Sequence, residues 1–169
     1  MYNDALGRDY LRRAGARLQA LAVLHAAGSW ADVVREAQEA VEITLKALLR
    51  ACRIEVPRIH DVSPVLEDNR ERLPKSILEP LPELMRISRS LRRDRELAFY
   101  GSEDLTPSEF YTEEDATTAL AQATRVYEAV SGALGPAGRG GTGDGPIGVE
   151  ARPDAGTAEG LPGGPPLQR

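Results

Sequence analysis

The chain has 169 residues, of which 41% are hydrophobic, and it carries a net charge of −5. This is long enough for one domain with a hydrophobic core, and it lacks the strongly basic balance of a general nucleic-acid-binding protein. The single cysteine excludes an internal disulfide and a cysteine-rich metal cluster. Because no charged-then-apolar leader and no membrane-length apolar run is present, we expect a soluble, cytoplasmic protein without membrane contact.

Two long helices are predicted in the first third of the chain. Apolar residues at three- and four-residue steps predict a helix from residue 3 or 4 to residue 27, which Gly28 ends. His25 closes its apolar stripe, and we expect a half-buried, hydrogen-bonded side chain rather than a ligand. The second helix covers 30–52, with Ser29 as its cap. Its inward face is predicted to consist of Trp30, Val34, Ala37, Val41, Leu45, Leu48 and Cys52.

Prolines interrupt the middle of the chain, so only short helices are predicted there. Asp61 or Ser63 can cap a helix that begins at Pro64, a favoured residue of a first helical turn. A second short helix is predicted around residues 75–78. His60 precedes both helices, and we expect it to brace the loop; a role in binding is the alternative.

A helix predicted over 82–100, which ends at Gly101, has two faces of opposite character. Its apolar stripe consists of Leu84, Ile87, Leu91, Asp94 and Ala98. Because an ionised carboxylate on such a face must be paired, we expect Asp94 to contact an arginine such as Arg93. The pair either fixes the helix register or forms a polar site at a helix–helix or subunit seam. Basic residues on the other side are expected to form a solvated face: Arg86, Arg89 and Arg93, with Arg92 and Arg95 adjacent.

The last helix is predicted over 112–134. Thr112 and Asp115 resemble a capping box at its start, and a Gly-Pro pair stops it. Residues 135–169 hold 11 of the 16 glycines and 6 of the 12 prolines, so we expect a disordered C-terminal tail that has too few apolar side chains to pack. The chain is therefore predicted to be all-α, with an antiparallel bundle of four or five helices over residues 1–134.

Three segments resemble the HEPN family in the same order along the chain. Residues 37–49 resemble the family pattern Ala-x4-Glu-x3-Lys-Ala, in which Glu42 and Lys46 also stand in the favourable order for an i,i+4 ion pair. His60 opens a segment similar to the family's His-Asp-Leu tripeptide. Arg93, Asp94 and Tyr100 resemble the motif Arg-polar-x3-His-x-Tyr, whose histidine position holds Ala98 here.

The resemblance implies an all-α bundle that forms a homodimer, often beside a minimal nucleotidyltransferase. In members that are metal-independent ribonucleases, the motif's arginine and histidine carry the activity. Because Ala98 cannot transfer a proton and no histidine follows His60, the predicted function is non-catalytic. We expect the protein to bind a nucleotide, another phosphate-bearing ligand or RNA, or a nucleotidyltransferase partner, within a toxin–antitoxin-type pair.

The candidate ligand-binding or seam residues are Arg93, Asp94, Tyr100, Glu42, Lys46 and His60, and neither a metal nor a cofactor is expected. Two alternatives stay open. One is a divergent HEPN ribonuclease toxin in which Arg93 and Tyr100 carry a weaker activity. The other is an interaction scaffold whose Arg–Asp pairs serve only the fold.

Deleting residues 135–169 should shift the midpoint of thermal unfolding by no more than a few degrees, because this segment offers almost no apolar surface to pack on the bundle. Calorimetry of the truncated and full-length chains checks this expectation. A large drop in the midpoint would show that the tail docks on the helices.

Overall fold

The computed structural model describes residues 4–100 and 106–135, except for the side chains of residues 4 and 94–100. The described residues form helices without a strand, which confirms the all-α prediction. The long helices are α1 (Asp4–Ala26), α2 (Trp30–Ala51), α5 (Leu81–Tyr100) and α7 (Glu113–Leu134). The short ones are α3 (Ser63–Asp68), the 3₁₀ helix η1 (Arg70–Arg72), α4 (Lys75–Leu78) and α6 (Pro107–Phe110).

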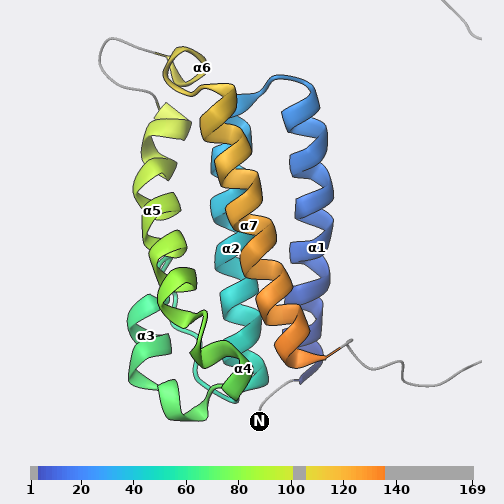
Figure 1. Cartoon of the computed structure of the whole chain (residues 1–169), viewed down its shortest axis with the longest axis vertical. Coiled ribbons are helices and arrows are strands. Elements are labelled where there is room, and N and C mark those ends of the chain that lie inside the picture. Colours follow the sequence, from blue (N-terminus) through green and yellow to red (C-terminus); the bar gives the residue numbers. More distant parts are fainter. Residues whose placement is uncertain (1–3, 101–105, 136–169) are drawn as a thin grey trace, which may run out of the picture. The chain divides into compact units, whose positions relative to one another are not determined.

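Helix α2 lies inside the bundle and packs against α1, α5 and α7 (Figure 1). The inward face predicted for α2 therefore included too few residues, because three neighbouring helices bury more of its surface than one apolar stripe provides. Its buried residues include Val33, Ala40, Thr44 and Leu49 in addition to the predicted apolar core. Trp30 and Cys52, at the two ends of the predicted face, are only half-buried.

The turn from α1 to α2 follows the rules of helix termination. The amide of Gly28 donates to the carbonyl of His25, and the amide of Ser29 donates to that of Leu24. This pattern is a Schellman motif, and it places Gly28 at a φ of +72°, where residues with a Cβ are strained. Ser29 is the N-cap residue of α2, as predicted, but its hydroxyl donates to Asp32 Oδ2 at 2.7 Å and makes no cap hydrogen bond to the backbone.

Two capping boxes organise the segment between α5 and α7. Thr112 Oγ1 accepts from the amide of Asp115, and the Asp115 carboxylate accepts from the amide of Thr112, which confirms the predicted start of α7. Thr106 and Glu109 form a second box that begins α6, a helix absent from the sequence prediction. Gly135 ends α7 at a φ of +75°.

Some sequence expectations concern parts of the chain outside the description. The tail, residues 136–169, is one of them. The structure also does not describe the side chains of Asp94, Ala98 and Tyr100. The inward ion pair expected for Asp94 therefore stays a prediction. Among the helices that are described, none is both long and apolar enough to cross a membrane.

Gly15 marks a close approach of α1 to α7, since a Cβ built there would lie 2.9 Å from the Tyr127 hydroxyl oxygen. Gly15→Ala should therefore lower the free energy of unfolding by about 1 kcal/mol, because overpacking outweighs the gain in helix propensity. Gly132 on α7 is the matched control, since a Cβ there meets no atom within 4 Å. Gly132→Ala should raise stability by roughly 0.5 kcal/mol. Urea unfolding of both variants checks the contrast, and equal effects would contradict it.

Candidate functional site

The carboxylate of Glu42 is the centre of a polar cluster on α2. Its side chain is only 12% exposed. Lys46 Nζ donates to Oε1 at 2.7 Å, and Gln38 Nε2 donates to Oε2 at 3.0 Å. His60 Nδ1 lies 3.0 Å from Oε2 and must carry the hydrogen of this bond, because an ionised carboxylate only accepts. The structure thus brings together three of the residues singled out in the sequence: Glu42, Lys46 and His60.

These partners keep Glu42 ionised in spite of its burial. Burial raises the pKa of the carboxyl group, but the hydrogen bonds from Lys46, His60 and Gln38 and the charge of Lys46 lower it by more. The pKa therefore lies below its ordinary value of 4.5. Glu42 consequently holds a negative charge at neutral pH that Lys46 balances.

The loop that carries His60 is itself held in place by Asp61. Asp61 Oδ1 accepts from the amide of Ser63 at 3.0 Å and from its hydroxyl at 2.6 Å. It also accepts from the hydroxyl of Ser88 on α5 at 3.1 Å. Asp61 thus braces the turn before α3 and ties the loop to α5. This contact places His60 against α2. The predicted cap by Asp61 or Ser63 of a helix from Pro64 is wrong, because α3 begins at Ser63, its N-cap is Val62 and no side chain makes a cap hydrogen bond.

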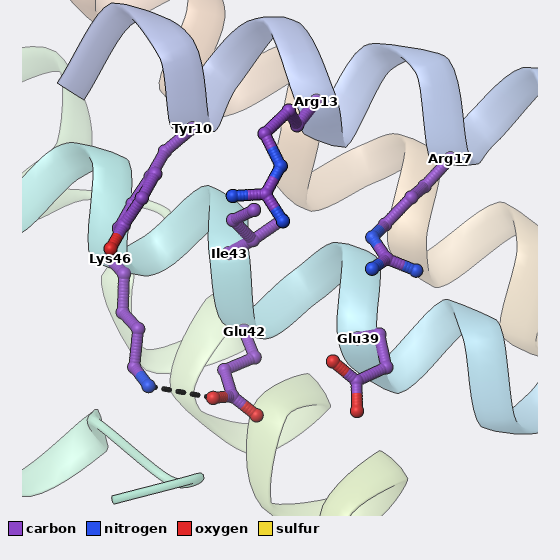
Figure 2. Close-up of a pocket in the computed structure, with 7 residues that line it drawn as sticks. All are labelled: Tyr10, Arg13, Arg17, Glu39, Glu42, Ile43 and Lys46. Carbon is purple, nitrogen blue, oxygen red and sulfur yellow. Dashed lines mark hydrogen bonds and ion pairs between the residues drawn. The ribbon is translucent and has the colours of Figure 1, made fainter. Parts of the chain in front are cut away.

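A cleft of about 190 Å³ lies beside the cluster, between α1 and α2 (Figure 2). We call it the α1–α2 cleft. From α1 three side chains extend toward α2, at positions i, i+3 and i+7: Tyr10, Arg13 and Arg17. From α2 the lining side chains are Glu39, Glu42, Ile43 and Lys46. Because the two helices form an antiparallel hairpin, these two polar stripes face each other along the cleft.

The cationic side chains that line the α1–α2 cleft differ in whether a carboxylate pairs with them. Arg17 donates to Glu36 at 2.6 Å, and Lys46 is paired with Glu42. Arg13 is exposed and makes no hydrogen bond or ion pair with any residue in the described part of the chain. Its guanidinium group is therefore open to a ligand, and guanidinium groups bind phosphate and carboxylate with paired hydrogen bonds.

Arg93 does not line the α1–α2 cleft; it is exposed on α5. The other two residues of its motif, Asp94 and Tyr100, have side chains outside the description. The sequence reasoning missed Tyr10, Arg13 and Arg17. Each immediately precedes a residue of the apolar stripe of α1, at Leu11, Ala14 and Leu18, and this regular offset is the signal that could have found them.

The remaining reactive side chains take part in packing. His25 Nε2 lies 2.8 Å from Thr117 Oγ1 on α7, and its ring meets Trp30 edge-on at 5.1 Å between centroids. Cys52 is half-buried, and burial raises the pKa of its thiol more than the nearby charge of Arg72 lowers it. No cluster of three or more His, Cys, Asp or Glu side chains suited to a metal ion occurs in the described residues.

Comparison with known proteins identifies the domain. The sequence profile of the HEPN domain matches residues 8–133, which is most of the chain and includes every described helix from α2 to α6. No curated protein and no solved structure shows a significant match to the chain. The resemblance inferred from three short segments is thereby confirmed at the level of the family.

Glu42→Gln should destabilise the fold by about 1–3 kcal/mol at pH 7, because Lys46 and His60 lose a charged hydrogen-bond acceptor. The lowered pKa of Glu42 also makes the stability of the fold depend on pH. Its contribution to stability is complete well above pH 4.5 and is lost as the pH falls through the folded-state value. Stability of the wild type should therefore fall more steeply below pH 4.5 than stability of the variant.

Glu67→Gln is the control for this experiment, because Glu67 and Arg70 form an exposed pair, 52% and 47% accessible. Such a pair contributes less than about 0.5 kcal/mol. Urea unfolding at several pH values measures both variants. Identical pH profiles for the wild type and Glu42→Gln would contradict the role assigned to the cluster.

Proposed function

The chain belongs to the HEPN domain family, and from this premise we propose that it is a non-catalytic binding protein that holds a phosphate-bearing ligand, such as a nucleotide, in the α1–α2 cleft. The observation that carries the proposal is the convergence of Arg13, Arg17 and Lys46 on one cleft in which Arg13 has no described partner. A phosphate bound between the guanidinium groups of Arg13 and Arg17 would accept charge-assisted hydrogen bonds from both.

The rest of the lining favours a ligand with few negative charges. Glu39 and Glu42 face the same space, and additional phosphates would be repelled by their carboxylates. The carboxylate of Glu39 suits a hydroxyl or amino donor of the ligand, and the ring of half-buried Tyr10 offers an apolar surface with a polar tip. These features support a nucleoside monophosphate more than a triphosphate.

The chemistry of the chain supports binding without catalysis. A ribonuclease of this family would need a histidine near Arg93, and the corresponding residue is Ala98. The chain has two histidines. Nδ1 of His60 is hydrogen-bonded to Glu42, and Nε2 of His25 is hydrogen-bonded to Thr117. The proposal includes assembly as a homodimer beside a minimal nucleotidyltransferase in a toxin–antitoxin-type pair, as the family resemblance implies.

Calorimetric titration with AMP, ATP and inorganic phosphate tests the proposal. We expect AMP to bind more tightly than ATP, and Arg13→Gln to weaken AMP binding about tenfold or more, since a charge-assisted hydrogen bond contributes about 1.5–3 kcal/mol. Arg8→Gln is the matched control, because Arg8 is an exposed arginine of the same helix outside the cleft. It should leave AMP binding unchanged.

Two results would overturn this function. Absence of AMP and phosphate binding at millimolar concentration would favour the interaction scaffold. RNA cleavage by the wild type that Arg93→Ala abolishes would establish the ribonuclease alternative, in which Tyr100 and Arg93 act without a histidine.

A further inference from the structure

The Glu42 carboxylate connects the α1–α2 cleft with a histidine outside it. Glu42 lines the cleft, and its Oε1 accepts from Lys46, a second lining residue. Figure 2 shows this bond, with the other carboxylate oxygen directed away from Lys46. That oxygen, Oε2, lies 3.0 Å from Nδ1 of His60, which does not line the cleft. One carboxylate therefore contacts a cation inside the cleft and an imidazole outside it.

The geometry lets His60 take up a proton without moving. Nδ1 carries the hydrogen of the bond to Glu42, so the free lone pair of the neutral ring lies on Nε2. In the described part of the chain, the bond to Glu42 is the only hydrogen bond or ion pair of this side chain, which is 49% exposed. A proton added to Nε2 from water therefore changes the charge of the ring and leaves the bond to Glu42 in place.

The charges around His60 come from α2 and from its own loop. The loop contacts α5 where Asp61 accepts from the hydroxyl of Ser88, which is a neutral group. Glu42 is the carboxylate that His60 itself contacts, at 3.0 Å. The titratable and charged groups in these surroundings are Glu42 and Lys46 on α2, and Asp61 and Arg58 in the loop.

A proton on His60 changes the charge balance of the cleft. When His60 is neutral, Glu42 is paired with one cation, Lys46. When His60 is protonated, two cations share the same carboxylate. Glu42 then repels an anion in the cleft less strongly, and Lys46 is held less tightly and can donate to that anion.

We propose that His60 is a proton-controlled regulator of the α1–α2 cleft, which binds an anionic ligand more tightly when His60 is protonated. This inference rests on the proposed function, because it concerns the affinity of the same site. Histidine ordinarily changes its charge between about pH 5 and 8, so the affinity should rise as the pH falls through this range. Because coupling between two sites is reciprocal, a bound anion must in turn favour the protonated ring.

The test measures AMP binding to the full-length chain by calorimetry at about pH 5.5 and about pH 7.5, on the two sides of the histidine titration. Phosphate monoesters titrate in this range too, so the pH response of each variant is compared with the same probe. From the lower pH to the higher, the wild type should lose about fivefold more affinity than His60→Gln, the lower end of typical coupling. Glutamine keeps an N–H donor for Glu42 but takes up no proton.

The matched control is His25→Gln. His25 is the other histidine of the chain, and its Nε2 lies 2.8 Å from Thr117 Oγ1 on α7, outside the cleft. This variant should keep the pH response of the wild type.

A second measurement needs no substitution at His60. Because the chain has two histidines, His25→Gln assigns their imidazole signals in a proton NMR spectrum. Saturation with AMP should raise the pH at which the His60 signal titrates by about 0.7 pH unit, as a fivefold coupling requires.

Each of three results would contradict the proposal. If the wild type and His60→Gln respond equally to pH and AMP leaves the His60 titration unmoved, His60 does not control the cleft, and AMP binding still supports the proposed function. Loss of the pH response in His25→Gln would place the controlling proton on the other histidine. Absence of AMP binding by the wild type at both pH values would overturn the proposed function and this inference together.

Discussion

The need to satisfy one nearly buried carboxylate connects the parts of this bundle. Helix α2 is surrounded by α1, α5 and α7, and Glu42 is ionised on it with a side chain only 12% exposed. Water cannot solvate that charge fully, so the protein must supply donors. Lys46 and Gln38 come from the same helix, whereas His60 comes from the following loop. The position of that loop is therefore coupled to the charge on α2, and Asp61 extends the coupling to α5 through Ser88.

The α1–α2 cleft is concave and mixes cations with carboxylates, so it suits a small ligand that brings both an anion and a hydrogen-bond donor. Local arrangement, rather than the net charge of −5, therefore determines where this protein presents cations.

Local sequence rules predicted those features that depend on a few neighbouring residues. Gly28 ends α1 because a glycine tolerates positive φ, and Thr112 begins α7 because its hydroxyl can accept from the amide of Asp115. The same rule would have found α6, since Thr106 and Glu109 have the capping-box spacing with a proline between them. Ser29 shows the limit of the rule: its hydroxyl donates to Asp32, and a preferred residue type does not fix the bond that forms.

The sequence by itself determined the helical class, most helix ends, the family and the pairing of Glu42 with Lys46, because periodicity, capping and i,i+4 contacts act over a few residues. Tertiary structure decided the rest. It brought His60 to Glu42 from 18 positions away, widened the buried face of α2, and placed Tyr10, Arg13 and Arg17 opposite Glu39 and Lys46. A stripe on one helix becomes a site only through the register of its neighbour, and that register is set by packing across the whole bundle.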